Sequence, residues 1–132
     1  MSVETEMLNI ATKFLDERYG KEAGCVAVLR LETGSYLTSV YTGDHNVSSV
    51  DLCAETGSIC EAHKLNKKVT HSLCVYKGKE SKTYEILSPC GVCQERLRFW
   101  GKGVKVAITN KENKLIFKTL EEICPHYWDA GK

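Results

Sequence analysis

Two cysteine motifs constrain the fold of this chain more than any other feature. Cys53-Ala54-Glu55 lies at the start of one expected helix, and Pro89-Cys90-Gly91-Val92-Cys93 opens another. Cys90 follows Cys53 by 37 residues, room for the rest of the first helix and one strand. Such a βαβ-like path starts both helices at the same edge of a sheet. We therefore expect two helix N-termini to face one point.

Apolar residues at helical and at strand spacing alternate along the chain. Helices are expected around Met7–Leu15 with a stop at Gly20, at Leu52–Leu65 with Ser49 or Asp51 as N-cap, at Cys93–Trp100, and at Thr119–Glu122. Strands are expected at Cys25–Leu31, Tyr36–Tyr41, Val69–Tyr76, Val104–Thr109 and Leu115–Phe117, and Tyr84–Leu87 could extend the strand layer. The last two strands are joined too closely for a crossover helix and should form an antiparallel hairpin. The pattern predicts an α/β fold, a three-layer α/β/α sandwich around a mixed five-stranded sheet.

Length, composition and charge disfavour several classes of protein. The chain has 132 residues, 42% hydrophobic and 27% charged, and we expect residues 1–132 to form a single domain. A net charge of +1 lacks the basic excess of nucleic-acid-binding proteins. No apolar run approaches the roughly 20 residues of a membrane span. The acidic N-terminus is unlike a signal peptide, so we expect a cytoplasmic protein.

The cysteines indicate metal chemistry. There are seven, an odd number, which favours metal binding or catalysis over a disulfide framework. Thiols at helix N-termini lose protons readily, and three thiolates around one point predict a Zn²⁺ site with an open fourth position, as catalytic zinc requires. Glu55 should not share a helix face with Cys53, but it can reach a zinc-bound water and take its proton. The remaining cysteines are expected to be buried small hydrophobes: Cys25, Cys60, Cys74 and Cys124.

Other interpretations of these motifs stay open. The Pro89–Cys93 stretch alone could be a redox dithiol at a strand-to-helix turn. Its late position, and a third cysteine that precedes Glu55, weigh against this interpretation. A structural zinc site would need a fourth ligand, for which the candidates are His45, His63, His71 and His126.

The two motifs together resemble the zinc-dependent cytidine deaminase superfamily, whose signature is [HC]-x-E followed by P-C-x-x-C. The three-cysteine form is similar to the small cytidine deaminases and the blasticidin-S deaminases. The resemblance covers most of the chain, including its ending from Glu121 to Trp128. It implies a cytidine-deaminase-like fold with zinc on Cys53, Cys90 and Cys93.

The same resemblance implies roles for further residues. Glu55 would transfer protons, and the backbone of Ala54 and Ser88 would contact the ring carbonyl and the amino group of the substrate. Trp128 would take the position of an aromatic residue that, in relatives, closes the pocket of a neighbouring subunit. The expected assembly is accordingly a homo-oligomer, a tetramer before a dimer.

Several positions depart from the family pattern. Nucleoside deaminases hold ribose through N-x-E, where this chain has Thr42 and Asp44, which we take as substrate-binding candidates. Ala23 replaces an aromatic that contacts the pyrimidine, and Thr56 replaces an arginine near the thiolates. Arg96 is the nearest candidate to offset the net charge of three thiolates on a dication.

The sequence thus predicts a zinc-dependent hydrolytic deaminase that releases ammonia from a small molecule with an aminated pyrimidine-like base. A cytosine nucleoside or a blasticidin S-like compound would be the substrate. The alternative is a non-catalytic zinc-binding protein that retains the deaminase fold. A deaminase of RNA or DNA is a third interpretation, which the near-neutral charge disfavours.

Overall fold

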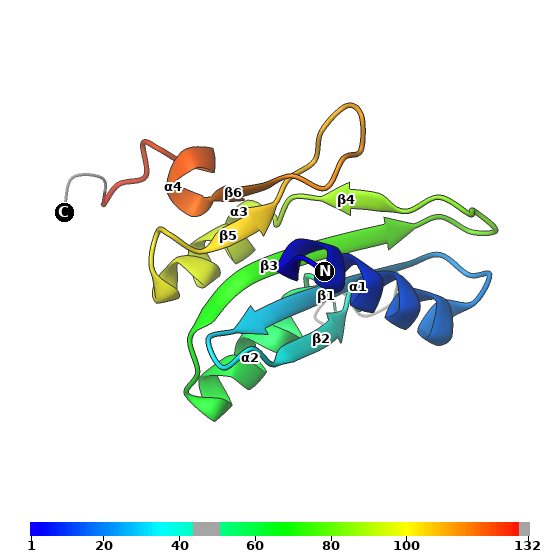
Figure 1. Cartoon of the computed structure of the whole chain (residues 1–132), viewed down its shortest axis with the longest axis horizontal. Helices are drawn as coiled ribbons and strands as arrows, with labels where there is room; N and C mark the ends of the chain where they lie inside the picture. Colours follow the sequence, from blue (N-terminus) through cyan, green and yellow to red (C-terminus); the bar gives the residue numbers. More distant parts are fainter. Residues whose placement is uncertain (44–50, 130–132) are drawn as a thin grey trace.

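A mixed sheet forms the middle of the fold (Figure 1). The computed structural model describes residues 1–43 and 51–129. The strands run in the order β2-β1-β3-β5-β6, and β4 pairs with β3 beside this path. The bounds are Gly24–Leu31 for β1, Tyr36–Val40 for β2, Val69–Lys77 for β3, Glu85–Leu87 for β4, Lys105–Ala107 for β5 and Phe117–Thr119 for β6.

Strand directions determine where the chain must cross the sheet. β1 is antiparallel to both β2 and β3, and β4 is antiparallel to β3. β3 and β5 are parallel, so the chain between them crosses by way of a helix. β6 then returns antiparallel to β5, which confirms the predicted terminal hairpin.

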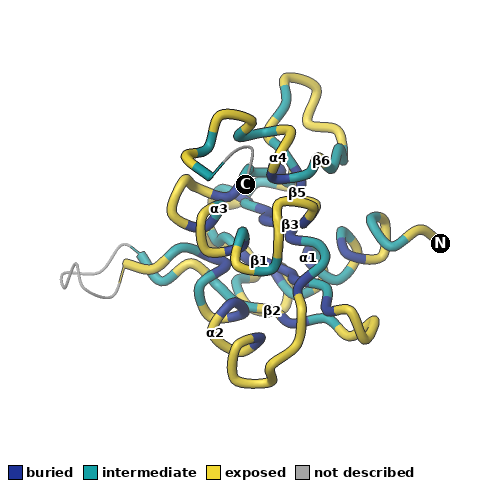
Figure 2. The backbone as a smooth tube through the Cα atoms, turned by 90° about the vertical axis from the view of Figure 1, so that its left-hand side faces the viewer, coloured by how far each residue is buried: buried dark blue, intermediate teal, exposed yellow. Residues whose placement is uncertain are grey.

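Helices cover both faces of the sheet. They are α1 at Val3–Tyr19, α2 at Thr56–Leu65, α3 at Gly91–Leu97 with a 3₁₀ turn at Arg98–Trp100, and α4 at Leu120–Ile123. Seen from the side, α1 lies on one side of the sheet and α2 and α3 lie on the other (Figure 2). The predicted three layers are therefore confirmed.

Each face of the sheet has its own apolar core, because successive residues of a strand point to opposite faces. β1 supplies Val26 and Val28 to the α1 side, and Ala27 and Leu29 to the α2 and α3 side. The helices contribute Met7, Ala11 and Leu15 on the first side and Ile59, Ala62, Cys93 and Leu97 on the second.

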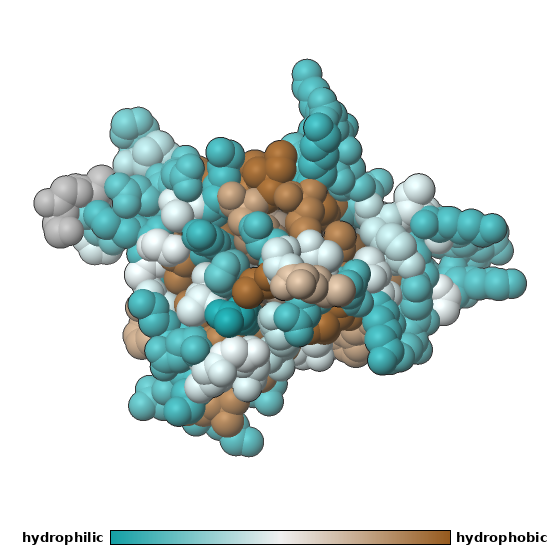
Figure 3. Space-filling model, viewed as in Figure 1, coloured by the Kyte–Doolittle hydropathy of each residue, from teal (hydrophilic) through white to brown (hydrophobic). Residues whose placement is uncertain are grey.

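α1 packs on one face of the sheet. Figure 3 shows this face with polar groups around the rim and apolar groups gathered near its middle. Tyr36, Leu115 and Phe117 pack against the α1 core and stay half-buried.

Two predicted features are wrong in detail. α2 begins at Thr56 instead of Leu52, with Glu55 in the N-cap position, so Asp51 does not cap it and Ser49 lies outside the described residues. The Tyr84–Leu87 segment forms a strand of its own, β4, so the described part of the sheet has six strands instead of five. None of the helices within residues 1–43 and 51–129 combines the length and apolar character that crossing a bilayer requires.

Candidate metal centre and active site

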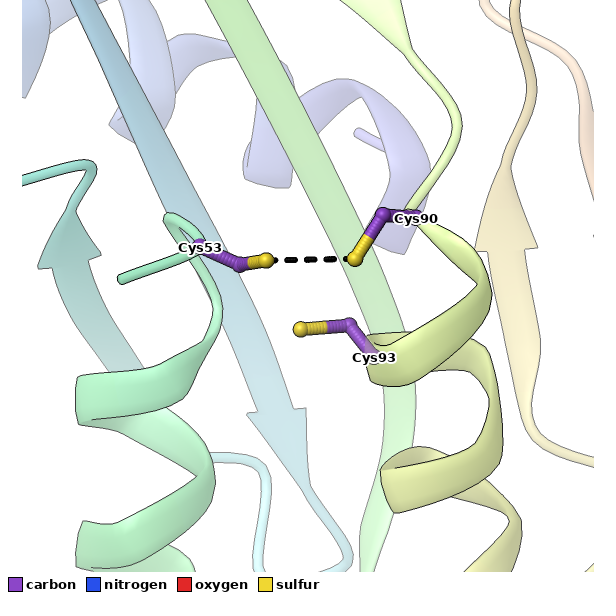
Figure 4. Close-up of side chains that lie close together, drawn as sticks. All are labelled: Cys53, Cys90 and Cys93. Carbon is purple, nitrogen blue, oxygen red and sulfur yellow. Dashed lines mark hydrogen bonds between the residues drawn. The ribbon is translucent and has the colours of Figure 1, made fainter. Parts of the chain in front are cut away.

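Three thiols meet between the starts of α2 and α3. The side chains of Cys53, Cys90 and Cys93 point toward one another (Figure 4), and their sulfur atoms all lie within 4.8 Å of each other. The sulfurs of Cys53 and Cys90 are 3.1 Å apart and share a hydrogen bond. Ligand sulfurs on a tetrahedral zinc, with Zn–S bonds of about 2.3 Å, are separated by roughly 3.8 Å. The donor set therefore fits a zinc ion after small shifts of the side chains.

Local hydrogen bonds place these cysteines at the two helix starts. Cys90 is the N-cap residue of α3, and its carbonyl accepts the N–H of Gln94 at 2.8 Å. Cys93 falls in the first turn of the same helix. Cys53 lies in the turn just before α2, where its carbonyl accepts the N–H of Thr56 at 3.0 Å. The predicted convergence of the two motifs is confirmed, although Cys53 precedes its helix.

The thiols differ in how readily they ionise. The hydrogen bond with Cys90, together with burial, raises the pKa of Cys53. Burial and the charge of Glu55 raise the pKa of Cys93. Burial also disfavours the Cys90 thiolate, but the N–H of Cys93 at the helix start and the Cys53 thiol lower the pKa of Cys90 overall. Thiolates this close repel one another, so a dication is the species that would stabilise all three together.

Glu55 lies beside the cluster although it is not one of its three ligand side chains. It is 2% exposed, and its charge acts on both Cys53 and Cys93. Burial raises the pKa of the Glu55 carboxyl. A buried carboxylate next to these three thiols is a candidate for proton transfer with a group bound there.

Two serines on neighbouring elements position this turn. The Ser39 hydroxyl donates to the Ala54 carbonyl at 2.6 Å and lies 2.7 Å from the Ser58 hydroxyl. Gly57 permits the approach of β2, because a Cβ there would come within 3.0 Å of the Ser39 Cβ. The sequence carries no signal for this contact, since nothing in the spacing links residue 39 to the cysteine motif.

Ser88 is held by a reciprocal pair of hydrogen bonds. Its N–H donates to the Thr109 hydroxyl at 2.9 Å, and the Thr109 N–H donates to the Ser88 hydroxyl at 2.9 Å. Its neighbour Pro89 accepts a hydrogen bond from the Gln94 side chain at 2.8 Å. These contacts tie the segment before Cys90 to the segment that follows β5 and to α3.

The other predicted substrate contacts are more dispersed. The Thr42 hydroxyl accepts the N–H of Leu52 at 3.0 Å, so this side chain joins the end of β2 to the segment before Cys53. Asp44 lies outside the described residues. Trp128 is 73% exposed in the C-terminal segment, beside Tyr127, which stacks on Arg98 at 4.3 Å.

Among the described residues, no fourth ligand side chain joins the three thiols. His63 packs against Phe99 and Trp100, and the Nδ1 of His71 lies 2.9 Å from the Thr70 hydroxyl. His126 is exposed, and His45 lies outside the described residues. The described part of the chain therefore offers three ligand atoms to a metal at this site.

The remaining cysteines only partly match the expectation of burial. Cys74 is buried, Cys25 and Cys124 are half-buried, and Cys60 is exposed, so the expectation for Cys60 is wrong. Cys60 lies on the outer side of α2, where periodicity alone does not tell a small apolar residue from a surface residue. The sulfurs of Cys25 and Cys74 are 3.3 Å apart.

Arg96 lies near the start of α2. Its Nη1 donates to the Thr56 hydroxyl at 3.1 Å. A guanidinium is thus held beside the residue three positions after Cys53, although it comes from α3. Its role in offsetting thiolate charge stays a prediction.

Comparison with known proteins identifies the family. The chain is 43% identical to a cytidine deaminase from Bacillus anthracis of known crystal structure, over 96% of this chain and 90% of that one, with a TM-score of 0.91. The chain belongs to the cytidine deaminase superfamily. Within this superfamily it is also 25% identical over 127 residues to a blasticidin-S deaminase from Bacillus cereus, spanning 92% of this chain and 89% of that protein.

More distant members of the superfamily agree in fold. The crystal structure of a cytidine deaminase from Mycobacterium leprae matches with a TM-score of 0.71 at 18% identity, over 95% of this chain and 99% of that one. At that identity the likeness concerns the fold alone. No family model matches the chain.

Proposed function

We propose that this protein is a zinc-dependent hydrolytic deaminase acting on a cytosine-like base. The observation that carries the proposal is the meeting of three ligand thiols with one buried carboxylate, Glu55, at the starts of two helices. The reaction would consume one water, replace the exocyclic amine with oxygen and release one ammonia. The activities named for the relatives, cytidine deaminase and blasticidin-S deaminase, support this class of substrate.

Cys53, Cys90 and Cys93 would hold the zinc. Zinc in such a site acidifies water and so supplies a nucleophile near neutral pH. The Glu55 carboxylate would take the proton of the attacking water. It would give that proton to the ring nitrogen next to the reacting carbon. It would then take the second proton of the same oxygen and pass it to the amine, which leaves as ammonia while the carbonyl forms.

Two backbone segments would orient the base. Hydrogen bonds tie Ser88 to Thr109 and Ala54 to Ser39, so both segments are held in place where they approach the cluster. The Ser88 backbone would contact the amino group, and the Ala54 backbone would contact the ring carbonyl. A substrate held in a fixed orientation reaches the reactive geometry at a lower entropic cost.

The active protein would be a single domain that forms a homo-oligomer, a tetramer before a dimer. Large apolar side chains support an assembly of this kind, because Val92, Phe99 and Trp128 are 56%, 71% and 73% exposed in one chain. Trp128 would then cover a site in a neighbouring copy. A non-catalytic zinc protein with the same fold is the alternative, and four protein ligands on the bound zinc would favour it.

The decisive experiment combines metal content with turnover. The purified protein should carry about one zinc per chain and release ammonia from at least one of cytidine, deoxycytidine, cytosine and blasticidin S. Glu55→Gln should keep its zinc and lose about 10²- to 10⁴-fold in rate, the range that general acid–base catalysis supplies. Glu61→Gln, an exposed glutamate on α2, is the matched control. Wild-type turnover by Glu55→Gln would remove Glu55 from the mechanism.

A further inference from the structure

A pocket lies at the edge of the sheet where β3 and β5 begin. Because these two strands are parallel, their first residues come together there (Figure 1). Lys68, Thr70, His71 and Lys105 supply the polar part of the lining, and Trp100 forms part of the wall. We call it the strand-start pocket. Its volume of about 300 Å³ is at the lower end of the range of small-molecule sites.

The strand-start pocket is separate from the cysteine cluster. α2 begins beside the cluster at Thr56 and ends at Leu65, three residues before Lys68. The ten residues of this helix span about 15 Å. A ligand in the pocket would therefore lie at the far end of α2 from the thiols and from Glu55.

Neighbouring strands bring positive charge to this pocket. In the sheet, His71 of β3 pairs with Arg30 of β1 on one side and with Lys105 of β5 on the other. The Arg30 Nη1 lies 3.5 Å from the Thr70 hydroxyl, which lies 2.9 Å from the Nδ1 of His71. Burial and the charges of Arg30 and Lys105 lower the pKa of His71. The imidazole thus lies in a positive field that an anion would offset.

Two carboxylates near the pocket have other partners. The charge of Lys105 acts on the Glu122 carboxyl, but that carboxyl accepts the N–H and the hydroxyl of Thr119 at 3.0 and 3.1 Å. The Glu32 carboxyl accepts the backbone N–H of Lys68 at 3.4 Å. In the part of the chain that the structure describes, residues 1–43 and 51–129, no carboxylate oxygen lies within 4.0 Å of the Nζ of Lys68 or Lys105.

The lining suits a phosphate group. A phosphate monoester carries a charge of about −1.5 to −2 near pH of about 7 and presents three acceptor oxygens. Lysine ammonium groups bind phosphate as point charges, and a protonated imidazole adds a further charged donor. The whole chain has a net charge of +1, so its surface attracts anions weakly and binding would depend on local charge. Trp100 offers a ring to the organic part of an ester.

We propose that the strand-start pocket binds a phosphate group through Lys68, His71 and Lys105, either as free phosphate or as a small phosphate ester. The proposal does not depend on the deaminase function, because the pocket and the cysteine cluster lie at opposite ends of α2. Binding alone can therefore test it.

The test is a nuclear magnetic resonance titration of the zinc-loaded, isotope-labelled protein with inorganic phosphate and with phenyl phosphate. Sodium chloride keeps the ionic strength constant throughout. The dissociation constant should be about 1 mM or lower, which corresponds to two charge-assisted hydrogen bonds. Tighter binding of phenyl phosphate would support an ester as the ligand, and equal affinities would support the free anion.

Two lysine variants and a matched control locate the site. Lys105→Gln and Lys68→Gln should each weaken phosphate binding about 10-fold, because each removes one charged donor. Lys111→Gln removes the same charge from an exposed position between β5 and β6, outside the pocket lining, and should change the affinity less than about 2-fold. A wild-type dissociation constant above about 20 mM, or equal weakening by Lys105→Gln and Lys111→Gln, would overturn the proposal.

The titration of His71 gives an independent measurement. Arg30 and Lys105 are the charged groups whose fields act on its ring, and the Phe117 ring contacts it at 5.8 Å between centroids. Saturating phosphate should raise the pKa of His71, because an adjacent anion favours the protonated imidazole. The imidazole resonances of His126, which is exposed in the C-terminal segment, should not respond to phosphate. An unchanged His71 titration curve at saturating phosphate would contradict the assignment of the pocket.

Discussion

Cys90 is the most informative of the three proposed ligands to replace. Its side chain is exposed, and its thiol pairs with that of Cys53 at 3.1 Å. Serine is a favourable residue at the N-cap of a helix, the position that Cys90 occupies in α3. Cys90→Ser should therefore change the free energy of unfolding of the metal-free protein by no more than about 0.5 kcal/mol. Any larger effect must come through the metal.

The size of that effect follows from mass action. Free zinc at 100 times its dissociation constant stabilises the folded state by about 2.7 kcal/mol. A chain of 132 residues has an unfolding entropy of about 0.28 kcal/mol/K at about 2.1 cal/mol/K per residue, so Tm should rise by about 10 °C. If Cys90→Ser binds zinc a hundredfold more weakly, the stabilisation by the same concentration of zinc falls to about 0.4 kcal/mol, and the rise in Tm falls to about 1.5 °C.

Calorimetry with a chelator measures the stability of the metal-free protein, and calorimetry without it measures the stabilisation by zinc. Mass spectrometry of the metal gives the zinc content. Cys60→Ser is the matched control, because Cys60 is an exposed thiol on α2 outside the cluster. It should keep the full rise in Tm. A Cys90→Ser protein with one zinc per chain and the wild-type rise in Tm would refute the ligand assignment.

Three further predictions concern stability and assembly. Leu97 is fully buried beside the cluster, so Leu97→Ala should lower the free energy of unfolding by about 2–5 kcal/mol in urea titrations, whereas exposed Leu65→Ala should change it by less than about 0.5 kcal/mol. Hydrogen bonds from Tyr84 and Lys77 lower the pKa of Asp16, so the ionised carboxylate stabilises the fold fully above pH of about 4, and this stabilisation is lost as the pH falls through the lowered pKa. Asp16→Asn should be less stable than wild type at pH 7, by up to about 1 kcal/mol, and this difference should shrink steadily as the pH is lowered below about 4. Light scattering should report a homo-oligomer, and a mass of 14.8 kDa would contradict the predicted assembly.

The elements that were predicted well are those whose signals are local. The period of the apolar residues located α1, β1 and β3, because side chains three and four apart share a helix face and alternate residues share a strand face. The Thr119–Glu122 pattern located α4, whose capping box is present. The start of α2 was predicted too early, because the turn at Cys53 and Ala54 is held by Ser39, a residue on another strand.

The candidate site likewise has one part that local sequence signals predict and one part that they do not. The spacing of Cys53, Cys90 and Cys93 was sufficient to predict one cluster, and the structure brings the three sulfurs together. Two contacts had no signal in the sequence: the reciprocal hydrogen bonds between Ser88 and Thr109, and the close approach of the Cys25 and Cys74 sulfurs. Such contacts depend on which strands become neighbours, and a single chain's local pattern does not encode that.

The sequence alone determined the chemistry available to this protein: three thiols and one carboxylate, each assigned to the start of a helix by motif and spacing. The tertiary structure decided how that chemistry is enclosed. Parallel pairing of β3 with β5 brought the two helix starts together, and packing of α1, β2 and β3 gathered Tyr19, Tyr41 and Tyr76 around one pocket. The physical reason is that a helix start is selected by interactions within a few residues, whereas a pocket forms only where side chains distant in sequence are buried against one another.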